Sequence, residues 1–233
     1  NLAEGFADEF RKICEEVILV SGKINVALSG GSTPKILFTV LAVEYKNKIN
    51  WDKVNFYWVD ERCVPPDDDQ SNFGMTNGSL LKTITIPEKN IHRIIGENDP
   101  GKEAERYSDL LKKNIQVKNN FPEFDLILLG IGEDGHTASI FPDQMQLLHS
   151  GKYCAVAIQP KTGQQRITLT GKVINNAERI YFTATGKGKS EVVGKILNKK
   201  NNYLEYPASH IQPGRGVLKW FLDKEAGKQV VKS

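Results

Sequence analysis

The sequence alternates short apolar runs, rich in β-branched residues, with amphipathic stretches, and this alternation limits the possible folds more than any other feature. The apolar runs predict strands at Ile24–Leu28, Val54–Val59, Ile91–Ile94, Phe124–Leu129, Tyr153–Ile158, Ile167–Thr170 and Ile180–Thr183. Between many of them lie predicted helices, of which examples are Pro34–Tyr45, Lys102–Lys118 and Lys189–Asn198. Strands that alternate with helices favour an α/β fold with a mostly parallel sheet flanked by helices.

Composition excludes several classes of protein. Hydrophobic residues make up 39% and charged residues 25% of the 233 residues, which is typical of a globular chain long enough for one packed domain. The net charge of +3 is spread along the sequence, so we expect no nucleic-acid partner. The chain lacks an apolar run of about 18 residues, and its acidic start lacks the pattern of a signal peptide, so we expect no membrane association.

The cysteines indicate a reducing compartment. The chain has three of them, Cys14, Cys63 and Cys154, which is an odd number without CxxC spacing. Free thiols are typical of a cytoplasmic protein. No pair of histidines, and no histidine with a cysteine, has the spacing of zinc ligands. We therefore expect a cytoplasmic chain that holds no metal.

The first loop of interest is Ser29–Pro34, which follows a predicted strand and opens a predicted helix. In a parallel sheet the ligand binds beyond the carboxyl ends of the strands, so such loops are where a site is expected. The glycines Gly30 and Gly31 permit a sharp turn, and Ser32 or Thr33 would cap the helix. The exposed amides and the helix dipole would then bind an anion such as phosphate. An ordinary turn before a capped helix is the alternative.

Two further loops carry charged residues at strand ends. Asp60, Glu61 and Arg62 follow the strand Val54–Val59 in a row, which is costly unless they face a solvated or functional crevice. Asp60 could orient a water or a sugar hydroxyl, and Arg62 could hold a phosphate or carboxylate through its planar fork. Lys189 opens a later helix, and Arg166 could add a second cation to a phosphate site. A surface cluster of salt bridges is the alternative.

The loop that contains His136 predicts catalysis. Residues 130–135 formally match the glycine pattern of dinucleotide-binding loops, but Glu133 and Asp134 stand where a pyrophosphate would lie. Histidine titrates near neutrality as a residue type, so His136 is the expected general base. Either Asp134 or Asp60 could orient its imidazole. A histidine that is hydrogen-bonded only to the backbone of a tight loop is the alternative.

At this point the residues match a known family. The chain closely resembles the 6-phosphogluconolactonases, within a wider group that includes the glucosamine-6-phosphate deaminases. The matching segments span nearly the whole chain in order, and they are Ser29–Lys35, Asp60–Pro65, Ser71–Gly74, Ile91–Ile94, Phe124–Pro142, Arg166–Thr170, Thr185–Glu191 and Tyr206–Pro213.

Two positions favour the lactonase branch over the deaminase branch. Deaminases carry an acid shortly after the Asp-Gly-His core, whereas this chain continues with Thr137–Pro142, which contains no acid. Arg62 also stands where deaminases usually carry tyrosine. One departure from the lactonase pattern is the segment Gln159–Gln165, which is usually rich in proline; the alignment of Arg166 survives it.

The resemblance implies a single Rossmann-like domain over residues 1–233, similar to glucosamine-6-phosphate deaminase. It implies hydrolysis of 6-phospho-D-glucono-1,5-lactone to 6-phosphogluconate in the oxidative pentose phosphate pathway, with His136 as the base and no cofactor or metal. Phosphate-binding residues would come from Gly30, Gly31, Ser32, Arg62, Arg166 and Lys189. The oxyanion donors would be Arg62 or a loop amide.

We expect a monomer. Since some members of the family are fused to glucose-6-phosphate dehydrogenase and this chain has no initiator Met, such a fusion or association is also open. Three other functions compete with the lactonase: a deaminase of glucosamine 6-phosphate, a sugar-phosphate sensor that does not need His136, and a nicotinamide-dependent dehydrogenase that rests on the glycine pattern alone.

Overall fold

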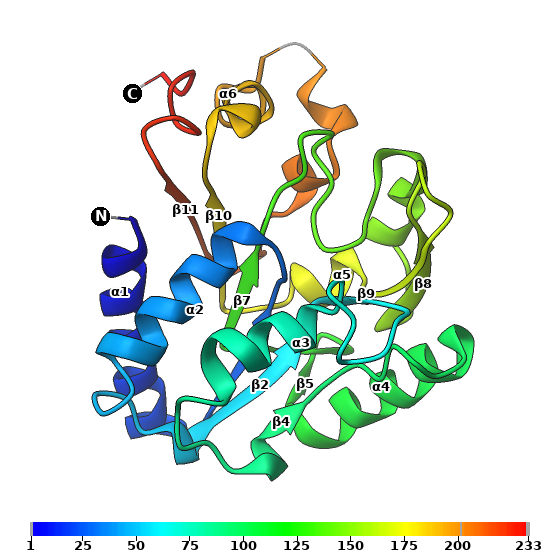
Figure 1. The fold of residues 1–233 in the computed structure, drawn as a ribbon. Coiled ribbons are helices and arrows are strands. Elements are labelled where there is room, and N and C mark those ends of the chain that lie inside the picture. The colour runs from blue at the N-terminus through cyan, green and yellow to red at the C-terminus, as the bar shows by residue number, and fades with distance from the viewer. Residues whose placement is uncertain (1, 201, 232–233) are drawn as a thin grey trace.

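A six-stranded sheet forms the centre of the molecule in the computed structural model, which describes residues 2–200 and 202–231 (Figure 1). Its strand order is β11-β10-β7-β1-β2-β4, and every neighbouring pair is parallel. The strands are β1 (Ile24–Leu28), β2 (Val54–Trp58), β4 (Ile91–His92), β7 (Leu126–Leu129), β10 (Arg179–Ala184) and β11 (Val217–Leu222). Every residue of β1 and β7 is buried, as a parallel sheet covered on both faces requires. The predicted α/β fold is confirmed.

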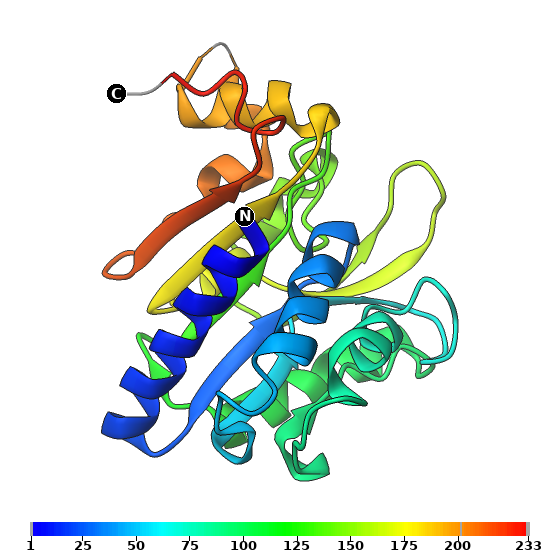
Figure 2. The same ribbon diagram turned by 60° about the vertical axis from the view of Figure 1, so that its left-hand side comes forward.

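Helices cover the sheet from both sides. They are α1 (Leu2–Ser21), α2 (Ser32–Glu44), α3 (Asn72–Thr76), α4 (Pro100–Asn114), α5 (Gly171–Ile174) and α6 (Ser190–Leu197). Figure 2 shows α1 running along the sheet beside α2. The buried side chains of α1 include Phe6, Phe10, Ile13 and Val17, whose spacing places them on one helical face. The first helix therefore belongs to the core.

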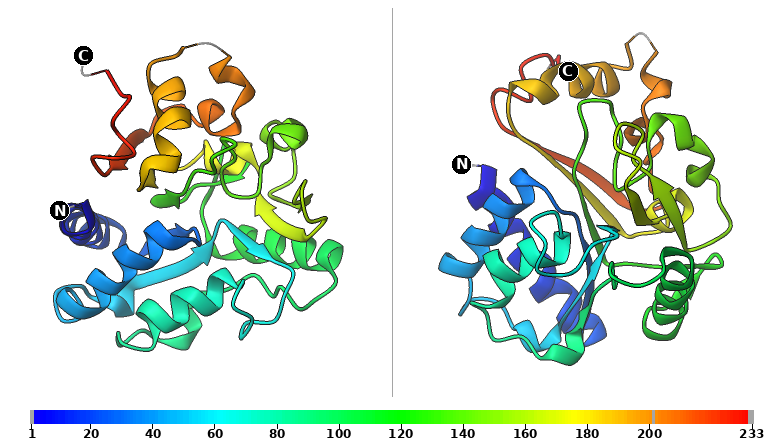
Figure 3. Two further views of the ribbon diagram at one scale, coloured as in Figure 1. Left: turned by 45° about the horizontal axis from the view of Figure 1, so that its top comes forward. Right: turned by 45° about the vertical axis from the view of Figure 1, so that its right-hand side comes forward.

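A second, antiparallel sheet stands beside the first in the order β3-β9-β8, with β3 at Asp60–Arg62, β8 at Cys154–Ile158 and β9 at Gln165–Leu169. The two predicted strands at Tyr153–Ile158 and Ile167–Thr170 exist but belong to this sheet, and the Asp60–Arg62 loop is itself a short strand. In Figure 3 this sheet and α4 lie on one side of the parallel sheet, with α1 and α2 on the other.

Val59 joins the two sheets. Its N–H donates to the carbonyl of Leu28 in β1 at 3.0 Å, and its carbonyl accepts from the N–H of Leu169 in β9 at 2.7 Å. The chain therefore passes from β2 of the parallel sheet into β3 of the antiparallel sheet within a single residue, beside the carboxyl end of β1.

The remaining elements are short. Helix α4 ends at Asn114, so the predicted helix Lys102–Lys118 is too long, and a small hairpin of β5 (Val117–Lys118) and β6 (Phe121–Pro122) follows it. Short 3-10 segments lie at Trp51–Lys53, Glu88–Asn90, Pro142–Leu148, Lys187–Lys189, Tyr203–Glu205 and Pro207–His210, and a π-helical turn lies at Asn77–Leu81.

None of the helices in the described part of the chain is both long enough and apolar enough to cross a bilayer.

Candidate active site

A cavity of about 190 Å³ opens at the carboxyl ends of the parallel strands, where the sequence predicts a site. Nearly all of the predicted site residues line it: Gly30, Gly31, Ser32, Asp60, Arg62, His136, Arg166 and Lys189. Asp134 lies next to His136 without lining the cavity. Asn72 and Ala138 also line the cavity and were not predicted as site residues.

His136 is hydrogen-bonded to Asp134. The Nδ1 atom of His136 lies 2.5 Å from Oδ1 of Asp134, and the backbone N–H of His136 donates to the same oxygen at 3.2 Å. Partial burial would raise the pKa of Asp134, but the hydrogen bond and the charge of His136 outweigh it and lower that pKa below its usual value. With Nδ1 bound to a carboxylate, the neutral ring carries its proton there and keeps Nε2 as an acceptor.

The turn that carries His136 depends on glycine. The N–H of Gly132 donates to the carbonyl of His136 at 2.8 Å, which closes the loop. A Cβ on Gly132 would lie 2.1 Å from Nδ1 of His136, so no larger residue fits there without moving the imidazole. Gly135 has a φ of +77°, and a Cβ on it would lie 2.4 Å from the ring of Tyr206. These two glycines let the loop fold tightly around the Asp134–His136 pair.

Asp60 has a different role in the structure from Asp134. Its buried carboxylate accepts a hydrogen bond from Oγ of Ser139 at 2.6 Å and a longer one from Nδ2 of Asn72 at 3.3 Å. Of the two acids that the sequence left open as partners of the imidazole, Asp134 is the one that bonds it. The side chain of Asn72 packs closely against Gly30, because a Cβ on Gly30 would lie 1.7 Å from Oδ1 of Asn72. Asp60 thus links β3, the start of α3 and the turn after His136, and each of these segments contributes a residue to the cavity lining.

Arg62 and Arg166 lie opposite each other in the register of β3 and β9. The Nε atoms of both are buried without a hydrogen-bond partner, although Nη1 of Arg62 donates to the carbonyl of Gln70. Burial first, and then the charge of Arg62, lower the pKa of Arg166. Two like charges held side by side on a cavity wall favour an anion between them, since an anion would offset both the repulsion and the lost hydration.

The first turn of α2 faces the same cavity without a side-chain cap. The N-cap residue is Gly31, with a φ of +112°, so the expectation that Ser32 or Thr33 caps the helix is wrong. Oγ1 of Thr33 instead lies 2.7 Å from Oγ1 of Thr185, which links α2 to the loop before Lys189. An uncapped helix start presents free amides and a positive dipole end, so this turn is suited to bind an anion.

Two polar side chains complete this part of the cavity. Oγ of Ser29, at the end of β1, is buried without a hydrogen-bond partner, and Ser29 lines the cavity. Lys189 is half-buried at the start of α6 and also lines the cavity. The predicted phosphate-binding residues are therefore brought together, with Ser29 as an addition.

Glu61 lies outside the cavity lining and holds residues that line it. Its buried carboxylate accepts hydrogen bonds from the backbone N–H groups of Arg62, Asn72 and Phe73 at 2.7–2.8 Å, and from Oγ of Ser71 at 3.1 Å. Burial raises the pKa of Glu61, and these N–H donors oppose the rise. The acid therefore holds the start of α3, and with it Asn72, against the cavity.

We expect Glu61→Gln to lower the free energy of unfolding by about 2 kcal/mol, because glutamine offers one acceptor oxygen where the carboxylate offers two, and buried N–H groups would lose their partner. Urea denaturation followed by circular dichroism measures this loss. Glu88→Gln, at an exposed position, is the matched control and should leave the midpoint unchanged. A Glu61→Gln protein as stable as the unmodified one would show that the hydrogen bonds of Glu61 add little.

Other reactive groups in the described residues do not form a second centre. Burial raises the pKa of the Cys63 thiol to about 11, which leaves little thiolate near neutrality, in line with the absence of a histidine near it in the sequence. Across residues 2–200 and 202–231, no group of three or more His, Cys, Asp or Glu side chains is arranged to hold a metal ion.

Comparisons with known proteins identify similar sequences. The sequence profile of the family described as glucosamine-6-phosphate isomerases/6-phosphogluconolactonase matches residues 1–220. The chain is 42% identical over 219 residues to a 6-phosphogluconolactonase from Haemophilus influenzae, and the match covers 92% of each chain.

Solved structures extend the comparison to the fold. A 6-phosphogluconolactonase from Trypanosoma brucei superposes with a TM-score of 0.88 at 28% identity, over 99% of this chain and 95% of that one. A monomeric glucosamine-6-phosphate deaminase superposes with a TM-score of 0.80 at 20% identity, over 98% and 95% of the two chains. At that identity the deaminase shares the fold alone, which agrees with the predicted deaminase-like architecture.

Proposed function

The chain belongs to the glucosamine-6-phosphate isomerase/6-phosphogluconolactonase family and is an enzyme of the 6-phosphogluconolactonase type, and from this we propose that it hydrolyses 6-phospho-D-glucono-1,5-lactone to 6-phosphogluconate by attack of a water that His136 activates. The observation that carries the proposal is the Asp134–His136 pair at 2.5 Å, which stands beside a cavity lined by Arg62, Arg166 and Lys189. The reaction belongs to the oxidative pentose phosphate pathway.

Binding of the phosphate comes first in this proposal. The amides of Gly31 and Ser32, with the ammonium of Lys189 and the arginine pair, supply positive charge around the cavity. A phosphate fixed there turns binding energy at the remote end of the substrate into orientation of the lactone at the other end. The carbonyl carbon C1 would then lie within reach of a water held by His136.

The chemical step uses the free nitrogen of His136. Nε2 accepts a proton from water as the water oxygen attacks C1, and Asp134 stabilises the resulting imidazolium through Nδ1–H. The electron pair of the carbonyl moves onto its oxygen, and Arg62 or a loop amide stabilises this oxyanion. When the oxyanion collapses, the C1–O5 bond breaks and His136 returns the proton to the ring oxygen. The product is an open-chain acid.

Acid release from freshly made 6-phosphogluconolactone tests the proposal. A pH-stat should record proton release well above the spontaneous rate of hydrolysis, in proportion to enzyme concentration. Glucosamine 6-phosphate should give no ammonia, since the segment after His136 lacks the acid that deaminases carry. Acid release at the spontaneous rate would refute the lactonase, and ammonia release would favour the deaminase.

We expect Lys189→Ala to raise KM about tenfold and to change kcat by less than twofold, because the ammonium would bind the phosphate in the ground state and the transition state alike. Steady-state kinetics on the lactone measures both constants. Lys187→Ala removes an exposed lysine from the same turn and is the matched control, with no change expected. A fall in kcat at constant KM would place Lys189 in the chemical step instead.

We also propose that residues 1–233 form one domain that acts as a monomer in a reducing compartment such as the cytoplasm. Support comes from the free thiols of Cys14, Cys63 and Cys154 and from a cavity that one chain supplies. Gel filtration at micromolar concentration would separate a monomer from a dimer.

A further inference from the structure

Phe141 stands between the base and one of the cations, and we propose that it is a positioning residue that fixes the His136 ring relative to the Arg166 guanidinium. The ring centroid of Phe141 lies 4.8 Å from that of His136, with 43° between the ring planes. The guanidinium carbon of Arg166 lies 5.5 Å from the centroid of the same phenyl ring. One side chain thus contacts both the base and a cation that binds the phosphate. This inference rests on the proposed function, which gives His136 and Arg166 those separate roles.

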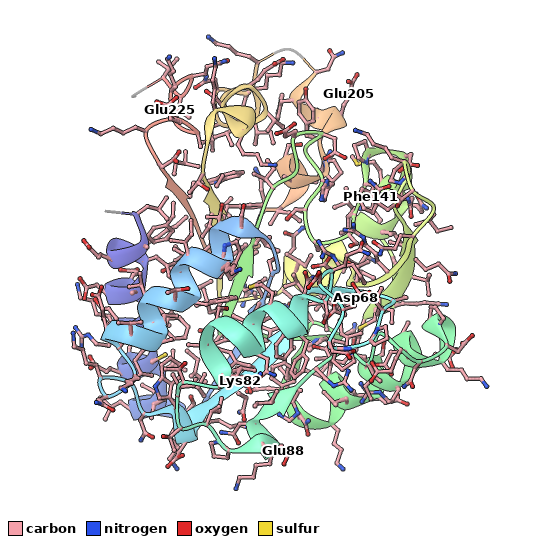
Figure 4. The ribbon with its side chains drawn as sticks, viewed as in Figure 1. Asp68, Lys82, Glu88, Phe141, Glu205 and Glu225 are labelled. Atoms are coloured by element: carbon pink, nitrogen blue, oxygen red, sulfur yellow. The ribbon has the colours of Figure 1, made fainter. Side chains whose placement is uncertain are left out.

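The backbone holds Phe141 firmly. Phe141 is completely buried, and it is the N-cap residue of the 3-10 segment Pro142–Leu148, where Figure 4 labels it. Its φ of −91° and ψ of 159° are extended, which is the conformation that a following proline favours. On its other side, the N–H of Ile140 donates to the carbonyl of Thr137 at 2.9 Å and closes the turn after His136. The phenyl ring is therefore carried by the same turn as the base.

The same turn is anchored to the antiparallel sheet that carries the cations. Ser139 donates its backbone N–H to Oγ1 of Thr168 in β9 at 3.2 Å and its hydroxyl to Asp60 in β3 at 2.6 Å. Two residues further on, Phe141 meets Arg166 of β9. His136 follows β7 of the parallel sheet, whereas Arg166 belongs to the antiparallel sheet. These contacts therefore fix the position of the base relative to the sheet that carries the arginines.

An aromatic ring has a property at this place that an aliphatic side chain lacks. A cation within about 6 Å of an aromatic face is attracted by the quadrupole of the ring, most strongly where water is excluded. Arg166 is such a cation, and its buried Nε has no hydrogen-bond partner to hold it. The imidazole becomes a second cation when His136 takes a proton. Removal of the ring would therefore loosen Arg166 and destabilise the protonated base together.

A comparison of Phe141→Leu with Phe124→Leu separates positioning from core packing. Phe124 is also completely buried, and its ring meets Tyr57 edge-on at 5.5 Å, just before β7 and so at the end of the sheet away from the cavity. The same atoms are removed in both variants, so both should lose stability. Only Phe141→Leu should lower kcat and raise KM, each about tenfold, whereas Phe124→Leu should keep both constants within twofold.

A spectroscopic readout tests the inference without turnover. The proton between Nδ1 of His136 and Asp134 should give a low-field NMR signal that His136→Ala removes. We expect this signal to broaden or shift in Phe141→Leu and to persist in Phe124→Leu. If the unmodified enzyme has no lactonase activity, the proposed function fails, but this signal still reports whether Phe141 holds the imidazole.

Unchanged kcat, KM and NMR signal in a folded Phe141→Leu protein would overturn the inference and leave Phe141 as ordinary core. If that variant does not fold, Phe141→Met takes its place in the same measurements, because the flexible methionine side chain fills an irregular space but has no aromatic face. The expected results and the overturning result are the same for it.

Discussion

Replacement of His136 with alanine should lower kcat about 10²- to 10⁴-fold and leave KM nearly unchanged, because general-base assistance is lost while the phosphate site stays intact. The imidazole is the group whose Nδ1 is held by Asp134 at 2.5 Å and which lines the cavity. Initial rates of acid release, corrected for spontaneous hydrolysis, measure the effect. Binding still orients the lactone in the variant, so a small rate above that of spontaneous hydrolysis should remain.

The control for His136→Ala is His149→Ala, which removes an exposed histidine a short way along the chain. It should behave like the unmodified enzyme. A His136→Ala protein that keeps kcat within a factor of about three, well short of the loss expected for a general base, would remove His136 from the mechanism. The base would then have to be sought among the other side chains of the cavity, with Asp60 first.

Gly132→Ala should lower kcat about 10²-fold, although no group that touches the substrate is removed. The new Cβ would lie 2.1 Å from Nδ1 of His136 and 2.3 Å from Oδ1 of Asp134, distances at which one of the two must move. A catalytic group displaced by about 1 Å can cost two orders of magnitude in rate. His136 acts as the base and Asp134 orients it, and neither side chain binds the phosphate in our proposal. KM should therefore change less than kcat.

Thermal unfolding should be measured beside the kinetics of Gly132→Ala, because the loop could also yield by local distortion. Gly151→Ala is the matched control, since an added Cβ there meets nothing within 4 Å. It should keep both the rate and the melting temperature. A Gly132→Ala enzyme with normal kcat would mean that the Asp134–His136 hydrogen bond can rearrange without loss, and would weaken its place in the mechanism.

Much of the fold could be predicted because buried parallel strands appear in the sequence as unbroken apolar runs. Strands β1 and β10 lie within a residue or so of their predicted bounds. Strand β11 was not predicted, because it lies at the sheet edge and its side chains are only partly buried. Nor could periodicity tell that β8 and β9 leave the parallel sheet, since pairing partners are set by tertiary contacts rather than by local sequence.

The site was predicted better in its residue types than in its contacts. Glycine, acid and histidine in one loop predicted the base, and the positions of Arg62, Arg166 and Lys189 near strand ends and a helix start predicted the cations. The choice between Asp134 and Asp60, however, depends on distances that no spacing rule contains. Asn72 and Phe141 were missed as site residues for the same reason: amides and phenylalanines are common everywhere, and only their neighbours in space single them out.

The backbone of Val59 has a mechanical consequence. Its N–H group bonds β1 and its carbonyl bonds β9, so the base-bearing and cation-bearing halves of the site are linked through the main chain of one residue. Planar peptide units and main-chain hydrogen bonds do not depend on which side chains fill the core. Substitutions that soften the hydrophobic interior can therefore lower the melting temperature while the span between histidine and arginines keeps its length, and the sequence of the core can drift more freely than the dimensions of the active site.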